Sequence, residues 1–447
     1  MRGQGLVAPV IIAVVAATAL AFGLSRLWVY GVDGPITNPV DFRAFYCSAH
    51  VLLGGADPYR YGPLQACQAA VLGVGGLQSN DLRILFAVLP PASIAFFGPF
   101  ALLPFRVATE AWLVASIFAV AYAIFTASAL ANASRLAVAF ALIFSLGIAS
   151  LVIGQVVPLV LAGMLFAAVA VRRNDGNAAV AGAAVGIIEP NLALPVWIAL
   201  AIFVPDTRRG FAVLFAIMAA LSLAFAPLTL EYLTSILGAH ARSELYNLTA
   251  QYSLSGVLAA FGVPARLALL AGSLSYVVML VVGIRLGSAL AERFADRAFL
   301  VLTPLAAVLV GGPYIHIHQM AAAIPFALLL CGNLESARLR AYAIVAIVAL
   351  AIPWQTVAEF RVFADLPATS MTAPPPVALQ RPRANDPIEI SNTAYIDTYA
   401  ARVDRRSFAE QIVWKIPTWC ALAIVLLVGR RALVARRAAV SRVVRTR

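Results

Sequence analysis

The chain has 447 residues, of which 62% are hydrophobic and 12% are charged, and its net charge is +12. Soluble domains carry about 25% charged residues, so a soluble fold of this composition could not cover its own surface. A mean hydropathy of +0.91 excludes that class and indicates a polytopic membrane protein. Arginines at helix ends supply the basic charge, which indicates membrane topology and lipid contact rather than nucleic-acid binding.

The first apolar segment, residues 6–29, predicts a retained membrane helix. It is longer than the apolar core of a cleaved signal peptide and has no small-residue cleavage site at its end. Eleven further apolar runs follow in chain order, near residues 84–104, 107–131, 136–153, 156–171, 178–204, 211–227, 265–290, 298–313, 319–333, 338–354 and 411–429. A crossing needs about 20 such residues, so we predict an all-α bundle of about 11–13 transmembrane helices.

Arginines predict the orientation of these helices, because positive charge is enriched in cytoplasmic connections. They place the following in the cytoplasm: Arg172, Arg173, Arg208, Arg209, Arg293, Arg297, Arg338, Arg340 and the basic tail 430–447. The loops 31–83 and 356–410, and the stretch 228–253, then face outward. The pattern fails once, because Arg106 and Arg135 flank a single predicted crossing.

Glu189-Pro190-Asn191 interrupts the apolar run 178–204 and predicts a broken helix or a hairpin. Irregular backbone at membrane depth is tolerated only beside protein or a water-filled cavity. A glutamate there is either functional or structurally paired.

The first polar loop, residues 31–83, contains a candidate amphipathic helix from Asp41 to Leu53. Its apolar face would carry Phe42, Phe45, Tyr46, Ala49, Leu52 and Leu53, and its other faces Asp41, Arg43, Ser48 and His50. Such a helix would lie in the plane of the membrane interface. Asp41 in its first turn is either a general base or a helix-capping carboxylate.

Cysteines and charged residues in the same loop leave alternatives open. Cys47 and Cys67 could form a disulfide if the loop is extracytoplasmic, or could be two free thiols. Arg43, Arg60 and Arg83 could bind a phosphate or lipid head groups. Asp33, Asp57 and Asp81 are weaker candidates than Asp41.

Two polar interruptions of apolar runs are further candidates. His316 and His318 begin the run that follows Gly311-Gly312, and ionisable groups at membrane depth are functional candidates. Two histidines are too few for a typical metal site. Gly154-Gln155 marks a junction between two helices. The sequence shows no phosphate-binding Gly-rich loop and no Asp-x-Asp motif, so we expect neither metal nor cofactor, and no soluble nucleotide-sugar site.

Five blocks in order resemble glycosyltransferase family 87, the polyprenyl-phosphate-mannose-dependent group of the type C glycosyltransferases. They are Asp41 to Tyr46 with Gly54 to Tyr59; Pro90-Pro91, Phe97 to Pro104 and Trp112; Gly154-Gln155 ahead of Arg172-Arg173; Ala181-Gly182 to Pro190; and His318 with Pro325. There are two departures. Glu189 stands where the family usually has Lys, and the stretch from Gln251 to Leu254 matches the family's Asn-Gln-Ser-Leu pattern loosely.

The resemblance implies a multi-pass plasma-membrane enzyme that moves a hexose, such as mannose, from a polyprenyl-phosphate donor to a lipid or glycan acceptor on the extracytoplasmic face. Asp41 would be the catalytic base, and Arg43, His318, Gln155 and Glu189 would lie at the donor and its phosphate. The alternatives are a transporter or lipid flippase, and a polysaccharide polymerase or ligase.

The domain organisation follows from the same blocks. We expect a glycosyltransferase module over residues 1–330, C-terminal helices over 331–429, and a basic cytoplasmic tail over 430–447.

Overall fold

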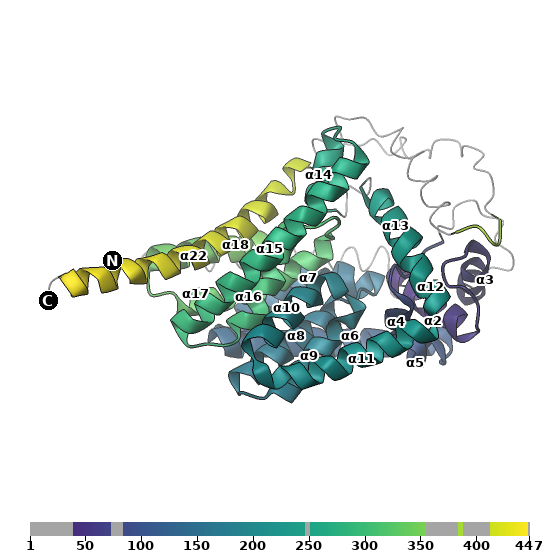
Figure 1. Cartoon of the computed structure of the whole chain (residues 1–447), viewed down its shortest axis with the longest axis horizontal. Coiled ribbons are helices and arrows are strands. Elements are labelled where there is room, and N and C mark those ends of the chain that lie inside the picture. Colours follow the sequence, from purple (N-terminus) through teal and green to yellow (C-terminus); the bar gives the residue numbers. More distant parts are fainter. Residues whose placement is uncertain (1–38, 73–83, 246–250, 355–382, 388–411, 446–447) are drawn as a thin grey trace.

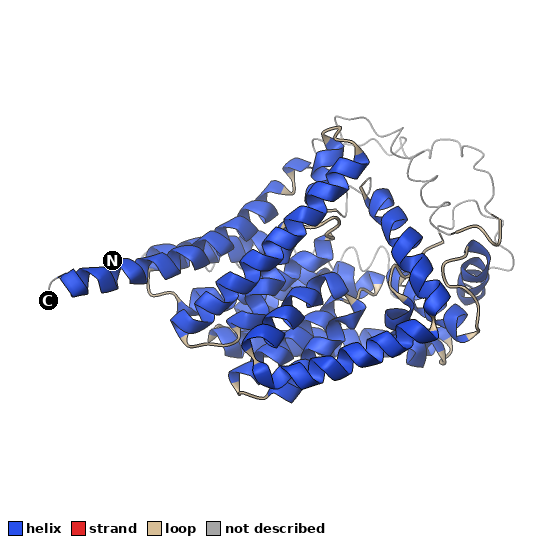
Figure 2. Cartoon of the chain, in the orientation of Figure 1, coloured by secondary structure: helices blue, strands red, loops and turns tan. Residues whose placement is uncertain are grey.

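The computed structural model describes residues 39–72, 84–245, 251–354, 383–387 and 412–445. Within these ranges every regular secondary-structure element is a helix (Figures 1 and 2), as the all-α prediction requires. The predicted first helix, residues 6–29, and most of the loop 356–410 lie outside the described residues.

The helices follow the predicted apolar runs over most of the chain. They are α2 (Val40–Leu53), α3 (Tyr61–Leu72), α4 (Pro91–Ile94), α5 (Gly98–Ala101), α6 (Phe105–Ala131), α7 (Arg135–Ile153), α8 (Val157–Arg172), α9 (Gly176–Ala184), α10 (Pro190–Phe203), α11 (Arg208–Ala224), α12 (Ala226–Glu231), α13 (Leu237–Glu244), α14 (Leu254–Ala260), α15 (Ala265–Phe294), α16 (Phe299–Ala307), α17 (Ile324–Asn333), α18 (Ala337–Ala351) and α22 (Ile416–Arg445). Short 3-10 segments are η1 (Ala95–Phe97), η2 (Val185–Ile188), η3 (Pro205–Thr207), η5 (Val308–Val310) and η6 (Ile317–Ala323), and η4 (Tyr232–Ile236) is a π-helix.

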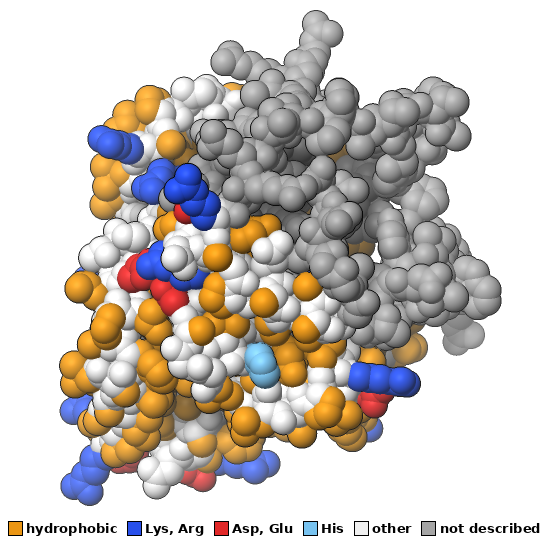
Figure 3. Space-filling model, turned by 90° about the vertical axis from the view of Figure 1, so that its right-hand side faces the viewer, with side chains coloured by type: hydrophobic (Ala, Val, Ile, Leu, Met, Phe, Trp, Pro, Cys, Tyr) orange, Lys and Arg blue, Asp and Glu red, His pale blue; other side chains and the backbone are white. Residues whose placement is uncertain are grey.

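Among the residues that the structure describes, four helices are long and apolar enough to cross a membrane: α6, α15, the stretch from η3 through α11, and the first 19 residues of α22. Much of their apolar surface is exposed, for example at Leu223 and Leu274. Exposed apolar side chains of this kind fit a lipid environment. Figure 3 shows one face on which hydrophobic side chains dominate and charged ones gather in small groups. Shorter apolar helices fill the space between the long ones.

The apolar run 84–104 does not form a crossing, contrary to the prediction. Residues 84–90 have no helix, and the rest forms only the short segments α4, η1 and α5. Prolines such as Pro99 and Pro104 prevent a continuous helix, because each lacks an amide hydrogen. Side chains from the first loop satisfy part of the extended backbone. The amide of Ala87 donates to Ser48 Oγ at 3.0 Å.

Helix α2 begins at Val40, one residue before the prediction, and ends at Leu53 as predicted, but its predicted polar positions are not all exposed. Arg43 and Ser48, expected on its outer faces, are 6% and 0% exposed. The helix packs against α3, α4 and α5, so it is enclosed by protein. His50 alone of the four predicted polar positions is exposed.

The stretch 228–253, expected to be an outer loop, is helical as far as Glu244. The π-helix η4 joins α12 to α13, so one curved rod runs from Ala226 to Glu244 (Figure 1). The prediction missed it because half of the residues in α13 are polar or charged.

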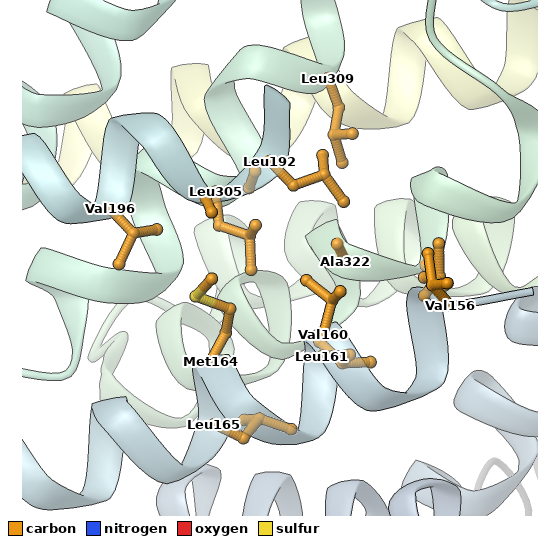
Figure 4. Close-up of a cluster of buried hydrophobic side chains, with 14 of the residues drawn as sticks. Val156, Val160, Leu161, Met164, Leu165, Leu192, Val196, Leu305, Leu309 and Ala322 are labelled. Atoms are coloured by element: carbon orange, nitrogen blue, oxygen red, sulfur yellow. The ribbon is translucent and has the colours of Figure 1, made fainter. Parts of the chain in front are cut away.

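Of the two forms predicted for residues 178–204, a broken helix or a hairpin, the structure has the hairpin. Helix α10 folds back on α9, so that Trp197 Nε1 donates to the carbonyl oxygen of Ala183 at 2.8 Å, and a Cβ placed on Gly176 would lie 2.7 Å from Asp206 Cβ. α9 and η2 end at Glu189, whose φ and ψ of −147° and 66° leave the helical region, and α10 begins at Pro190. A second interruption separates α16 and η5 from η6 and α17. Both interrupted elements pack on α8: Figure 4 shows Leu192 and Val196 of α10, Leu305 of α16 and Ala322 of η6 beside Val160 and Met164.

The predicted cytoplasmic arginines gather at one end of the bundle, called here the arginine-rich end. Arg172 Nε donates to Asp296 Oδ1 at 2.9 Å, and Arg297 Nη1 donates to Asn174 Oδ1 at 2.7 Å. These contacts join the end of α8 to the connection between α15 and α16. The 16-residue α8 spans about 24 Å, so its first residue, Val157, lies at the opposite end of the bundle. Arg135 begins α7 at the arginine-rich end, and Arg106 begins α6 at the opposite end. Arg106 is therefore the arginine that departs from the predicted charge pattern.

Candidate functional site

Asp41 lies in the first turn of α2, against the junction between α7 and α8. Gly154 ends α7 with φ of +76°, and a Cβ placed on it would lie 2.6 Å from Phe42 Cβ. Glycine alone allows both this backbone conformation and this close approach. The chain then turns so that the Gln155 amide nitrogen donates a hydrogen bond to Asp41 Oδ2.

An aromatic cluster fixes this contact. The ring of Phe42 stacks on Trp112 with centroids 4.9 Å apart, and Phe100 meets Phe42 edge-on at 5.9 Å. The indole nitrogen of Trp112 donates to the carbonyl oxygen of Gly154 at 3.1 Å. Residues from three of the resembling blocks therefore pack together, and their packing sets the position of the Asp41 carboxylate.

Glu189 occupies the break between η2 and α10. The Gln319 amide nitrogen donates to Glu189 Oε1, and Gln319 Oε1 accepts a hydrogen bond from the backbone amide of His316 at 2.8 Å. The two interrupted helices are thus joined through one side-chain amide. Glu189 is therefore hydrogen-bonded to the side chain of Gln319.

His316 forms an ion pair with Glu244 at the end of α13. Its Nε2 lies 3.1 Å from Glu244 Oε2, and Gln251 Nε2 donates to the same oxygen at 3.0 Å. Gln251 Oε1 accepts from the amide of Ile315 at 3.1 Å. The Gln251 side chain therefore links Glu244 to the backbone beside His316.

The charges in this region act on one another. Burial lowers the pKa of His316, but the hydrogen bond and charge of Glu244, followed by the charges of Glu189 and Asp41, raise it above its ordinary value. Burial raises the pKa of Glu244, but contacts with His316 and His240 hold it well below its usual range. The contact between the two side chains therefore favours the charged form of each. We call Asp41, Gln155, Glu189, Glu244, Gln251, His316 and Gln319 the polar cluster.

Each site residue predicted from the sequence lies in the polar cluster or next to it. Asp41, Gln155 and Glu189 are members. The imidazole of His318 is buried, with its centroid 5.2 Å from that of His316. The Arg43 guanidinium is buried on α2, where burial lowers its pKa and the charge of Asp41 raises it.

The polar cluster also contains three residues that the sequence did not single out as candidates: Glu244, Gln251 and Gln319. Gln319 directly follows the predicted histidine pair, so its place at the start of an apolar helix was a usable signal. Gln251 belongs to the stretch that matches a family pattern loosely. Glu244 gave no signal, because only the fold brings it to His316.

The other charged residues of the first loop lie elsewhere. Arg60 pairs with Asp57 at 3.0 Å and with Glu231 of α12 at 2.8 Å, so it ties the first loop to α12. Asp33, Asp81 and Arg83 lie outside the described residues. Among the described residues, no three histidine, cysteine or acidic side chains group as metal ligands.

Cys47 of α2 and Cys67 of α3 form a disulfide, which decides between the two alternatives for these thiols. Cys331 and Cys420 are free. The bridge fixes α3 against α2, two turns beyond Asp41. The described piece of the second loop, residues 383–387, pairs with the same region: the amides of Tyr61 and Gly62 donate to Asp386 and Ala384 at 3.0 and 2.9 Å.

Comparison with known proteins gives one match. The model of Glycosyltransferase family 87 matches residues 88–312, just over half of the 447-residue chain. No curated protein and no protein of solved structure matches. The matched region contains Gln155, Glu189, Glu244 and Gln251 of the polar cluster, and Asp41, His316 and Gln319 are packed onto it. The chain belongs to glycosyltransferase family 87 and is a membrane glycosyltransferase.

Proposed function

We propose that the protein transfers a hexose, mannose being the first candidate, from a polyprenyl-phosphate sugar to a lipid or glycan acceptor. The observation that carries the proposal is the Asp41 carboxylate, which Gln155 holds at the end of the bundle opposite the arginines. An isoprenoid tail stays in the bilayer, so a site built among membrane helices suits a donor of this kind.

The reaction is a single displacement with inversion at the sugar carbon. Asp41 accepts the proton of the acceptor hydroxyl as that oxygen attacks C1 of the sugar. The bond between C1 and the phosphate oxygen breaks, and its electron pair leaves with the lipid phosphate. The phosphate is a stable anion, so no separate general acid is needed.

The charge of each residue decides whether we assign it to the phosphate or to the sugar of the donor. Fixed positive charge stabilises a phosphate leaving group. Arg43 and the histidines at 316 and 318 are the nearby groups able to supply it or a hydrogen bond. A carboxylate repels phosphate but accepts hydrogen bonds from hydroxyl groups. Glu189 and the carbonyl oxygen of Gln155 are therefore assigned to the sugar rather than to its phosphate.

Two observations support a site on the extracytoplasmic face. Asp41 and Gln155 lie a full α8 length from the arginine-rich end, and arginines mark the cytoplasmic ends of membrane helices. The loop that carries Asp41 also contains the disulfide between Cys47 and Cys67, and disulfides persist in oxidising compartments.

Replacing Asp41 by Asn tests the proposal. We expect transfer from radiolabelled polyprenyl-phosphate mannose in membranes to fall by about 10²–10⁴-fold, the usual contribution of a general base. Asp57→Asn is the matched control, because Asp57 lies in the same loop and caps the Tyr59 amide at 2.8 Å, away from the polar cluster. An Asp41→Asn enzyme that works as well as the control would remove Asp41 as the base.

The donor and acceptor require a separate measurement. Lipid extracts from cells with and without the protein are compared for polyprenyl-phosphate sugars and for glycans. We expect the donor to accumulate and one glycan to lose a sugar when the protein is absent. Unchanged extracts, together with no transfer in membranes, would contradict the assignment of the donor.

A further inference from the structure

The start of α22 is fixed to the segment Gln251–Tyr252. Lys415, the one lysine in the sequence, donates a hydrogen bond from Nζ to the carbonyl oxygen of Gln251. One turn later, Trp419 Nε1 donates to the carbonyl oxygen of Tyr252 at 3.0 Å. The Lys415 ammonium also lies 5.0 Å from the centroid of the Tyr252 ring. Lys415, directly before α22, and Trp419 in its first turn therefore bind two successive carbonyl groups.

On the side away from Lys415 and Trp419, Gln251 and Tyr252 face His316 and its neighbour Ile315. The amide of Tyr252 donates to the carbonyl oxygen of Ile315 at 2.6 Å, and Gln251 pairs with His316 in an isolated antiparallel bridge. The side chain of Gln251 contacts Glu244, as described above. A displacement of Gln251 would therefore move both partners of the ion pair between Glu244 and His316.

Burial lowers the pKa of Lys415 to about 7, because the ammonium loses its hydration. The residue is 2% exposed, although a lysine next to the start of a membrane helix can extend its ammonium to the interface. A buried ammonium is stabilised only by hydrogen bonds or opposite charge. The carbonyl oxygen of Gln251 and the face of Tyr252 supply such contacts.

We propose that Lys415 and Trp419 are positioning residues for the transfer site. They hold Gln251 and Tyr252, and through them the ion pair between Glu244 and His316, next to Asp41 and Glu189. This inference rests on the proposed function, in which His316 serves the donor phosphate. It extends the functional unit to α22, which lies beyond the matched residues 88–312.

The test compares Lys415→Met, Lys415→Arg and the control Cys420→Ala in the purified full-length protein. Met keeps the side-chain size and removes the charge and the donor, whereas Arg restores both. Cys420 is an exposed residue of the same helix. The first readout is the titration of the histidine resonances by NMR, with His316 assigned among the four histidines through a His316→Asn variant.

The titration responds to the titratable groups that face His316. These are Glu244 from α13, Glu189 from the helix break, Asp41 from α2 and the neighbouring His318. We expect Lys415→Met to lower the pKa of His316, because the imidazolium loses its close contact with Glu244. Lys415→Arg should restore the wild-type titration. The control should not change it.

The second readout is sugar transfer across pH. We expect kcat to fall by roughly 10- to 100-fold in Lys415→Met, as for a displacement of about 1 Å at a reacting site, with recovery in Lys415→Arg. A folded Lys415→Met protein with unchanged His316 titration would overturn the positioning role. If the titration shifts but wild-type protein transfers no sugar, the positioning role stands and the proposed function fails.

Discussion

Gly154 is the residue on which the position of Asp41 depends. It combines a φ of +76° with the 2.6 Å approach to Phe42 Cβ. Gly55 has nearly the same φ, +74°, but no atom lies within 4 Å of the position a Cβ would take. Substitutions at these two glycines therefore distinguish the cost of backbone strain from the cost of a steric clash.

We predict that Gly154→Ala lowers stability more than Gly55→Ala. A left-handed conformation costs a non-glycine residue about 1–2 kcal/mol, and both variants lose this amount. Gly154→Ala must also displace α2, so it should lower sugar transfer as well. Thermal unfolding in detergent and a transfer assay measure the two effects. Equal loss of stability in both variants would show that α2 does not press on Gly154.

The ion pair of Glu244 and His316 gives stability a defined pH dependence. The pKa of Glu244 is depressed from 4.5, so its contribution is present above pH 4.5 and lost as pH falls through the depressed pKa. The pKa of His316 is raised from 6.5, so its contribution is present below pH 6.5 and lost as pH rises through the raised pKa. Both contributions are complete between these two values.

We predict that Glu244→Gln lowers the unfolding temperature most between pH 4.5 and 6.5. The difference from wild type should shrink as the pH rises through the raised pKa of His316, since neutral imidazole no longer pairs with the carboxylate. Unfolding temperatures measured from pH 4 to 9 in detergent give the comparison. Parallel curves for the two proteins would mean that the pair does not contribute through its charges.

At the scale of elements, the two interrupted helices bring Glu189 and Gln319 together. The turn at Glu189 was predictable, because a glutamate followed by Pro190 interrupts an apolar run. The hydrogen bond to Gln319 was not, since 130 residues separate the partners. Interrupted helices were also expected for the transporter alternative. Because the chain belongs to a glycosyltransferase family, we favour a role for these helices in binding the sugar.

We predict that Glu189→Gln raises KM for the sugar donor by about tenfold or more and changes kcat less. A hydrogen bond to a charged group is worth about 1.5–3 kcal/mol, and a contact made equally in the ground state and transition state acts on KM. Glu110→Gln on the exposed face of α6 is the control. A fall in kcat alone would instead assign Glu189 to the transition state.

The helices that sequence reasoning placed correctly are those with uninterrupted apolar runs, such as α6, α8 and α15. The hydropathy pattern depends on the composition of a segment and not on its surroundings in the fold. Predictions based on it were therefore wrong in two places. Residues 84–104 are apolar enough to cross, but their prolines break the helix. The periodicity of α2 suggested one polar side, yet α3, α4 and α5 enclose Arg43 and Ser48.

At the scale of the whole molecule, the site depends on contacts between distant parts of the chain. Gln155 lies 114 residues from Asp41, His316 lies 72 from Glu244, and Lys415 lies 164 from Gln251. The sequence predicted members of the site from their residue types and from the family resemblance. Their partners came only from the fold, because no periodic pattern records which helices become neighbours.

The arginine-rich end and the disulfide make one joint prediction about orientation. If Arg172 and Arg297 face the cytoplasm, then α2, α3 and the bridge between Cys47 and Cys67 face outward. In a variant with Cys331 and Cys420 changed to Ser, a membrane-impermeant maleimide should label intact spheroplasts only after reduction. A permeant reagent applied without reduction should also fail to label.

The two halves of this prediction fail in different ways. Labelling before reduction would show that the bridge does not form in the cell. Labelling that requires both reduction and lysis would place the loop inside, where reducing conditions disfavour disulfides. That result would reverse the orientation of α8 and move the Asp41 carboxylate to the cytoplasmic face. An acceptor on the outer surface could then no longer reach it, although the contacts within the polar cluster would be unchanged.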